Sequence, residues 1–311
     1  TFNNNTNFEI FISAQTRYEP GAIVQIESAT GGLTVVDTIF NGLAPGESIK
    51  IQDPVQSIFA VGLSTYDNTS QPTNKFGGVW ITREAISNVS GTPEWWHIGE
   101  LTAGEVPSKM EFSGDGDMLL VATNFGRVYR FSNLNQARSR ATADIDDDYT
   151  TNPVTPNTSV VQSSVIFTSG QAITALAIDP DDNDRIFIGL GNYGNSEYAF
   201  YTTRGTSANL SRALFANVTS NLPPFPVYDA IFNYNDPNDG QVILGTEYGI
   251  IATNDIDAAT VTWNNENNGF PNVPVFDLEQ TRTIRYDLKN SSDFEGSIFA
   301  GTHGRGIFKT N

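Results

Sequence analysis

The sequence predicts an all-β fold made of repeated four-stranded sheets. An apolar run, a glycine turn and a second apolar run recur along the 311 residues, at 121–130, 244–253 and 301–310. The aligned copies are 61, 67, 56 and 56 residues apart, and their equivalent positions are Val61, Ala122, Gly189, Gly245 and Gly301. A unit of that length suits four strands with their loops, which is one blade of a β-propeller.

Two consecutive units show all four strands, a to d. In one unit they span residues 173–179, 185–190, 198–203 and 213–218, and in the next 227–233, 241–246, 249–254 and 261–265. These runs are rich in Val, Ile, Phe and Tyr and are bounded by Gly, Pro, Asn and Asp, as strands are. We therefore expect about six four-stranded blades in a single domain over residues 1–311.

The two ends of the chain predict unfinished blades. A weaker first copy of the repeat places a strand b at residues 8–14, and the last copy ends on a strand c at residues 307–310. The first blade then lacks its strand a and the last lacks its strand d, which leaves open sheet edges. Either residues 1–7 close the last blade, or upstream sequence or a partner chain completes the terminal blades. We favour the second, with this chain the C-terminal part of a propeller of seven or more blades.

Charge and composition exclude several kinds of function. The chain has 35 acidic and 17 basic residues, a net charge of −18, and no cysteine. Without cysteine there are no disulfides, thiolate metal sites or thiol nucleophiles. The negative charge argues against nucleic acid as a partner. No apolar run approaches the roughly 20 residues of a membrane span. This balance favours a secreted or cell-surface protein.

An acidic stretch at residues 135–159 interrupts the third unit and predicts an exposed loop insertion. Its alternating Asp144, Asp146 and Asp148 are similar to a calcium-binding loop, but the glycine and terminal glutamate of an EF-hand are missing. We interpret the stretch as a solvated acidic loop, with calcium as the alternative. No other cofactor is expected.

The repeated Gly-Thr-x-x-Gly-Ile phrase and the Asp-Pro-Asp turn at Asp179 resemble the BNR-like (Asp-box) propellers, which include sortilin-type and xyloglucanase-like domains. Residues 253–257, followed by Trp263, form a degenerate Asp-box without its glycine. In that family the box is a structural turn. Such propellers are common in secreted Bacteroidota proteins with a C-terminal sorting domain, so the resemblance implies export by type IX secretion.

One face of the predicted propeller gathers candidate binding residues. Because strands alternate in direction, the b–c turns and the d–a loops lie on the same face. Stiff loops at 223–226 and 270–274 border it. The b–c turns carry a set of aromatic and basic residues: Phe125, Arg127, Tyr193, Tyr248, His303 and Arg305. Such a rim favours a protein or glycan ligand. The alternative is that these side chains only pack their turns.

Catalytic signatures are weak. A glycoside hydrolase needs two carboxylates across a cleft, and only location suggests Glu247 and Asp229. His97 and His303 have no partner at metal-ligand spacing. We therefore expect a non-catalytic, secreted or cell-surface interaction scaffold within a larger exported protein. The alternatives are a xyloglucanase-like hydrolase acting on polysaccharide and a structural subunit of a surface assembly that uses the open blade edges.

Overall fold

The computed structural model describes residues 23–27, 33–38, 58–67, 75–82, 96–102, 104–134, 161–281 and 296–310. The strand expected at 8–14, the acidic insertion at 135–159 and its three calcium candidates lie outside the described residues.

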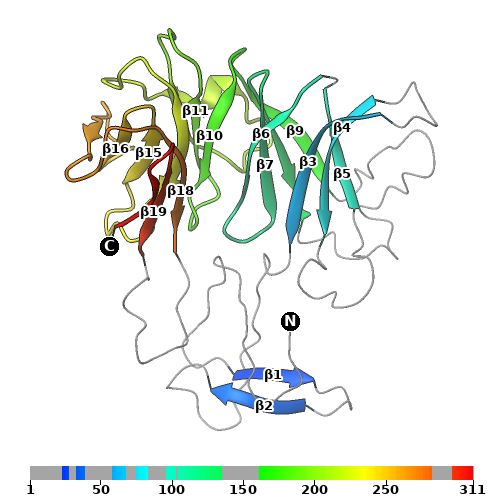
Figure 1. Ribbon diagram of the computed structural model, residues 1–311. Coiled ribbons are helices and arrows are strands. Elements are labelled where there is room, and N and C mark those ends of the chain that lie inside the picture. The colour runs from blue at the N-terminus through cyan, green and yellow to red at the C-terminus, as the bar shows by residue number, and fades with distance from the viewer. Residues whose placement is uncertain are drawn as a thin grey trace.

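Five antiparallel sheets follow one another along the chain in an arc (Figure 1). Sheet I consists of β3 (Phe59–Asp67), β4 (Lys75–Thr82) and β5 (Trp96–Leu101). Sheet II consists of β6 (Pro107–Phe112), β7 (Met118–Thr123), β8 (Arg127–Ser132) and β9 (Gln162–Thr168). Sheet III consists of β10 (Ile173–Ile178), β11 (Arg185–Leu190), β12 (Ala199–Thr203) and β13 (Ala216–Asn217).

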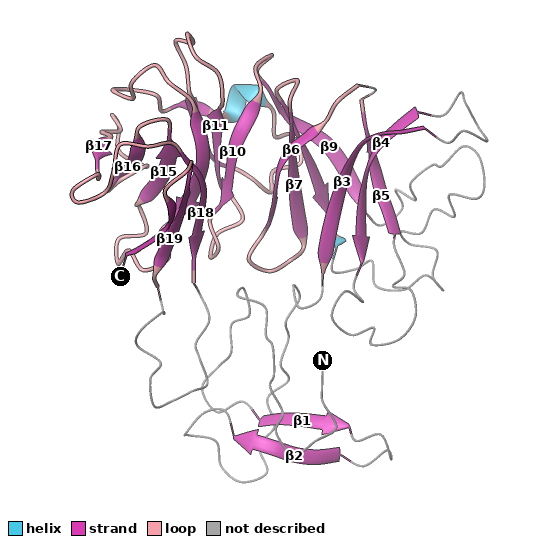
Figure 2. Ribbon diagram, viewed as in Figure 1, coloured by secondary structure: helices cyan, strands magenta, loops and turns pink. Residues whose placement is uncertain are grey.

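Sheet IV consists of β14 (Val227–Phe232), β15 (Val242–Thr246), β16 (Gly249–Thr253) and β17 (Asn264–Asn265). Sheet V consists of β18 (Val275–Gln280), β19 (Ile298–Thr302) and β20 (Gly306–Thr310). A separate two-stranded sheet pairs β1 (Ile23–Glu27) with β2 (Leu33–Thr38). The structure contains the 3₁₀ turn Arg212–Leu214, and strands dominate the described residues (Figure 2).

The strands predicted for the two clearest units are confirmed in sheets III and IV. Strands a, b and c fall within a residue or two of their expected bounds, but β13 and β17 are only two residues long. Both residues of each of these strands are exposed, whereas the outermost strand of sheet II, β9, is seven residues long.

The innermost strands β6, β10, β14 and β18 lie next to one another and begin in the same way. Each pairs its first residue with the last residue of the neighbouring strand b, and a β-bulge follows immediately. The bulged second residues are Ser108, Thr174, Tyr228 and Phe276. A bulge redirects a side chain, and here it recurs at the same point of sheets II to V.

Among the described residues, the buried apolar side chains form four clusters, each between two consecutive sheets. Phe131 and Ile81 belong to the cluster between sheets I and II, and Phe187 and Trp263 to that between sheets III and IV. The sheets are therefore joined face to face by buried apolar side chains, as propeller blades are.

Glycine in strand b allows consecutive sheets to pack closely. A Cβ on Gly189 would lie 2.9 Å from Val227 Cγ1 of the next sheet, and one on Gly245 would lie 2.8 Å from Val275 O and 3.0 Å from Val275 Cγ1. In sheet I the same place belongs to Gly62, whose Cβ would lie 2.7 Å from Pro107. The repeat alignment at Val61 was therefore wrong by one residue, because close packing and not the apolar pattern defines the register.

The end sheets are incomplete within the described residues. By this register β3 is a strand b, so no strand a is described in sheet I, and sheet V stops at its strand c, β20. No described strand joins sheet V to sheet I.

Candidate binding surface at the rim

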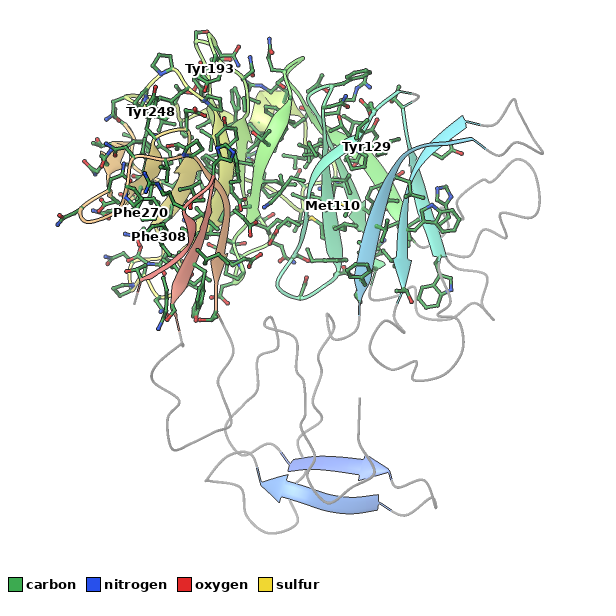
Figure 3. The ribbon with its side chains drawn as sticks, in the orientation of Figure 1. Met110, Tyr129, Tyr193, Tyr248, Phe270 and Phe308 are labelled. Atoms are coloured by element: carbon green, nitrogen blue, oxygen red, sulfur yellow. The ribbon has the colours of Figure 1, made fainter. Side chains whose placement is uncertain are left out.

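The b–c turns lie at the same end of the sheets as the starts of the innermost strands. Val227, the first residue of β14, pairs with Thr246, the last residue of β15, and the other sheets follow this register. Figure 3 shows Tyr193 and Tyr248 at this upper edge of the molecule. We call this end the rim.

Aromatic side chains from sheets III, IV and V meet around one carboxylate at the rim. We name this set the rim cluster: Tyr193, Tyr228, Glu247, Tyr248, Phe276 and His303. Its ring contacts run from Tyr228 to Phe276, with centroids 4.8 Å apart, and from Phe276 to His303, at 5.6 Å. Both distances suit aromatic pairs.

Three of the aromatic rings of the rim cluster face solvent. Tyr193 is 60% exposed, Tyr248 56% and Phe276 47%. Phe225, from the proline-rich d–a loop, packs edge-on against Tyr248 at 5.2 Å and supports it from the side. Single exposed aromatics are ordinary on protein surfaces, but a contiguous exposed group indicates an interaction surface.

Glu247 provides the charge of the cluster. The Tyr228 hydroxyl donates a hydrogen bond of 2.5 Å to Glu247 Oε2. Partial burial is the main cause that raises the pKa of Tyr228, and the carboxylate of Glu247 raises it further. The Tyr228 hydroxyl therefore stays protonated and remains a donor. Desolvation and the same carboxylate also raise the pKa of Tyr193. The second oxygen of Glu247 leaves acceptor capacity for a ligand.

The predicted rim residues of sheet II lie apart from this cluster. Phe125, in the β7–β8 turn, is exposed and lies beside Gly104. Arg127 instead forms an ion pair with the fully buried Glu105, which also accepts a 2.6 Å hydrogen bond from Tyr129. Arg127 therefore holds its own turn in place. This is the packing role that was the alternative to ligand binding for the predicted rim residues.

The β19–β20 turn presents the remaining candidates. His303 and Arg305 are both exposed there, and only His303 has a ring contact with the rim cluster.

Tyr228 and Phe276 were not predicted, because the predicted rim residues all come from b–c turns. Both are the bulged second residue of a strand a, where Ser108 and Thr174 donate hydrogen bonds to backbone carbonyls of the next sheet. At this repeat position sheets II and III have Ser and Thr, whereas sheets IV and V have aromatic residues. That change of residue type is the sequence signal that could have identified Tyr228 and Phe276.

The two carboxylates suggested for hydrolysis lie in different surroundings. Asp229 is 1% exposed and accepts hydrogen bonds from the backbone N–H groups of Ala230 and Leu278, and Lys109 Nζ lies 2.7 Å from its Oδ1. Burial raises the pKa of Asp229 despite this lysine. Its oxygens are occupied by structural contacts below the rim, whereas Glu247 lies at the surface.

His97 is a packed strand residue of β5. It is 1% exposed, stacks on Trp80 with ring centres 4.7 Å apart, and its Nδ1 has no partner among the described residues. Burial lowers the pKa of His97 to about 4. It is neutral at pH 7 and lies away from the rim turns.

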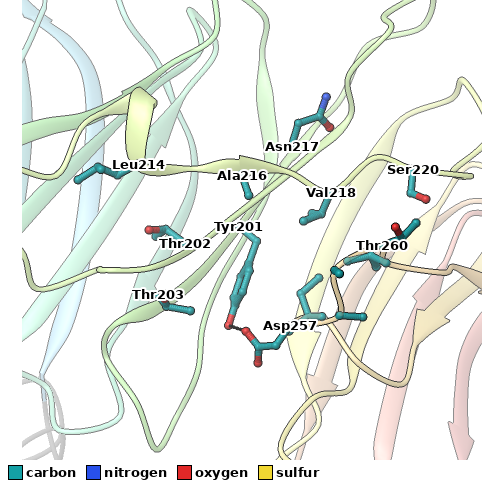
Figure 4. Close-up of a pocket in the computed structure, with 14 residues that line it drawn as sticks. Tyr201, Thr202, Thr203, Leu214, Ala216, Asn217, Val218, Ser220, Asp257 and Thr260 are labelled. Atoms are coloured by element: carbon teal, nitrogen blue, oxygen red, sulfur yellow. Dashed lines mark hydrogen bonds between the residues drawn. The ribbon is translucent and has the colours of Figure 1, made fainter.

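Residues 253–257, which the sequence likened to an Asp-box, form a local turn. Asp255 N approaches Thr253 Oγ1 at 3.3 Å, and Trp263 is buried, with its indole N–H donating to Val218 O at 2.8 Å. Nearby, a groove of about 490 Å³ runs along the outer side of sheets III and IV, where the Tyr201 hydroxyl donates to Asp257 (Figure 4).

Buried Arg185 joins three loops at the end of the sheets opposite the rim. It pairs with Asp179 at 2.6 Å, Asp257 at 3.0 Å and Asp239 at 3.1 Å. The turn aspartates are thus first of all structural. In the part of the chain that the structure describes, no group of three or more His, Asp or Glu could hold a metal, and no helix could span a membrane.

No protein-family model matches this chain, and no curated protein matches it either. Among solved structures, the chain is similar to Chaetomium thermophilum Sqt1 bound to the N-terminus of ribosomal protein L10, with 13% identity and a TM-score of 0.49 over 82% of this chain and 56% of that one. The Niastella koreensis GH74 enzyme shares 14% identity with a TM-score of 0.39, over 94% and 41% of the two chains.

The C-terminal WD40 domain of Sif2 shares 12% identity with a TM-score of 0.44, over 82% and 54%. The chain spans about half the length of these structures. Its own repeated sheets, with their shared bulge and inter-sheet cores, identify the fold as a β-propeller of four-stranded blades.

Proposed function

We propose that this protein is a non-catalytic binding scaffold and that the rim cluster is its ligand-binding surface. The observation that carries the proposal is the meeting of exposed aromatic rings from three consecutive sheets around Glu247. The sheets position these side chains, which project from the b–c turns and from the bulges of β14 and β18.

The chemistry of the cluster suits a protein or glycan ligand. Exposed aromatic faces gain contact area at low entropic cost, because Tyr and Phe have few rotatable bonds. Glu247 and the tyrosine hydroxyls add directional hydrogen bonds, which fix the orientation of a bound group. An acidic rim on a chain of charge −18 disfavours polyanions.

The proposed setting follows from the sequence. The repeat phrase and its Asp-Pro turns support a BNR-like propeller, and with the acidic composition they support a secreted or cell-surface position within a larger exported protein. The polysaccharide hydrolase is the weaker candidate, because Asp229 is buried and paired with Lys109.

A screen for ligands tests the proposal. We expect the purified chain to bind at least one member of a panel of plant and bacterial oligosaccharides and random peptides. Tyr193→Ala with Tyr248→Ala should weaken that binding at least tenfold, because both changes remove exposed ring area. A matched control is Phe59→Ala, an equally exposed aromatic at the start of β3, at the opposite end of its sheet. Binding that the rim variant leaves unchanged would reject the rim.

A further inference from the structure

Two carboxylates near the rim, one in sheet II and one in sheet IV, accept a hydrogen bond from a tyrosine hydroxyl in the same way. In sheet II, Tyr129 donates a 2.6 Å hydrogen bond to Glu105 Oε2. In sheet IV, Tyr228 donates a 2.5 Å hydrogen bond to Glu247 Oε2. The residues come from different positions of the repeat, so the two sites share their chemistry and not their place in the sequence pattern.

A guanidinium completes the site in sheet II. Arg127 Nη1 lies 2.5 Å from Glu105 Oε1, so this carboxylate has a hydroxyl on one oxygen and a cation on the other. Glu247 has the hydroxyl without the cation. Among the described residues, no lysine, arginine or histidine forms an ion pair with Glu247, and Arg305 of the β19–β20 turn is included in that statement.

The carboxylate of Glu247 can be reached from outside the molecule. Glu105 is fully buried, whereas Glu247 is half-buried in its turn at the surface. A carboxylate has about four lone-pair positions, and the described hydrogen bond from Tyr228 uses one of them. A donor on another molecule therefore has acceptor positions to bind.

The aromatic rings of the rim cluster stand at steep angles to one another. The planes of Tyr228 and Phe276 are 73° apart, and those of Phe276 and His303 are 54° apart. Such walls form corners and not a flat platform. The end of a slender side chain enters a corner more easily than the broad face of a sugar ring does, and the faces of aromatic rings attract cations.

The charge of the whole chain favours the same kind of ligand. Its net charge is −18, and a field of that sign draws positively charged groups toward the surface. The exposed rings of Tyr193 and Tyr248 extend the cluster beyond Glu247 at the upper edge of the molecule (Figure 3). A cation that pairs with the carboxylate therefore has aromatic surface beside it.

We propose that the rim cluster binds an arginine side chain of a protein partner. The guanidinium pairs with Glu247 as Arg127 pairs with Glu105, and the aromatic rings contact its flat face. Arginine fits better than lysine, because a guanidinium holds its donors in one plane and stacks on aromatic rings. This inference rests on the proposed binding function and narrows its ligand from proteins and glycans to proteins with an accessible arginine.

Three peptide libraries test the identity of the ligand. They contain short random peptides of uncharged residues around a central arginine, citrulline or lysine. Citrulline keeps the shape of arginine and removes its charge. At physiological salt, we expect the full chain to bind the arginine library about tenfold more tightly than the citrulline library, because charge-assisted hydrogen bonds are the stronger ones. The lysine library should bind with intermediate strength.

Variants of Glu247 locate the binding. Glu247→Gln keeps the size of the side chain and removes its charge, so it should weaken binding of the arginine library about tenfold and leave the citrulline library unchanged. The matched control is Glu266→Gln, at an exposed carboxylate just after β17 and outside the rim cluster. This control should bind the arginine library as wild type does.

Variants of Phe276 test the aromatic contact. Phe276→Leu keeps apolar bulk and removes the ring, so it should weaken binding of the arginine library about threefold, whereas Phe276→Tyr keeps the ring and should not. Thermal unfolding checks that each variant folds. Should Glu247→Gln fail to fold, the two Phe276 variants still test the site, because equal binding by both would overturn the proposal.

The remaining outcomes separate this proposal from the proposed function. Binding of the arginine library that does not exceed binding of the citrulline or lysine library would overturn the assignment of arginine. Arginine binding that Glu247→Gln leaves unchanged would overturn it too, because general attraction to an acidic surface then explains the binding. A neutral oligosaccharide whose binding is weakened by Tyr193→Ala with Tyr248→Ala would overturn arginine and leave the binding function intact. No binding of any peptide or oligosaccharide would reject both.

Discussion

His97 lies in β5 against the indole of Trp80 and directly over Gly78, where a Cβ would come within 2.6 Å of its Nε2. Burial lowers its pKa from 6.5 to about 4. Because the unfolded chain then binds a proton more readily than the folded one, the free energy of unfolding should fall as pH drops from about 6.5 to 4. The shift corresponds to about 3 kcal/mol at most.

Replacing this histidine isolates the effect. In His97→Phe, we expect the free energy of unfolding to depend less on pH between 6.5 and 4 than in wild type, because the titrating imidazole is gone. Denaturant unfolding across this pH range measures the difference. His303→Phe, at an exposed position, should keep it. Parallel pH profiles for wild type and His97→Phe would show that His97 is not buried as described.

Lys109 Nζ in β6 lies 2.7 Å from Asp229 Oδ1 in β14, so an ion pair joins the two strands. The same Nζ lies 3.8 Å from Asp277 Oδ1. Lys109→Met leaves a carboxylate that is 1% exposed without its cation, so it should lower the free energy of unfolding by about 3–5 kcal/mol at pH 7. Denaturant unfolding measures this loss.

The pH dependence of that variant has a defined sign. Burial already raises the pKa of Asp229, and losing the lysine raises it further, so the folded state of the variant binds a proton more readily than the unfolded chain. Its deficit should shrink as pH falls from 7 toward 5. The exposed Lys309→Met provides the control. A deficit that grows on acidification would contradict the assigned pairing.

At the scale of elements, strands with clear apolar runs could be predicted from the sequence, and their packing could not. The apolar runs between Ile173 and Thr253 predict strands a to c of sheets III and IV, because runs of β-branched and aromatic residues bounded by turn residues are typical of strands. The bulge at Tyr228 and Phe276 has no local sequence signature. It follows from the pairing of two strands, so the aromatic core of the rim was not predicted.

Glycine positions give a direct test of how neighbouring sheets pack. In Gly189→Ala, the new Cβ would lie 2.7 Å from Ala175 and 2.9 Å from Val227, so overpacking should cost about 1–3 kcal/mol of unfolding free energy. At the equivalent Gly301 the nearest described atom is Asp277 Cβ at 3.4 Å, and Gly301→Ala should change stability by less than about 0.5 kcal/mol. Equal costs in thermal or denaturant unfolding would contradict the assigned register.

At the scale of the whole molecule, apolar side chains pack each of the five sheets against the next in the same way, whereas the residues at the rim differ between sheets. The interiors between sheets repeat the same contacts, so they carry little that is specific to a ligand. The turns and bulged residues differ from sheet to sheet, and apart from Phe125 of sheet II the aromatic ones gather on sheets III to V. The sequence predicted this division between scaffold and surface, while the contacts of Glu247 and Tyr228 required the structure.

The central claim is that the rim cluster binds a ligand without converting it. The measurement that tests it most directly is a titration of the best ligand from the screen into wild type and Tyr248→Ala, with mass spectrometry of the recovered ligand. The account predicts a Kd at least tenfold higher for Tyr248→Ala and a ligand of unchanged mass. An unchanged Kd, or a ligand cleaved by wild type, would contradict it.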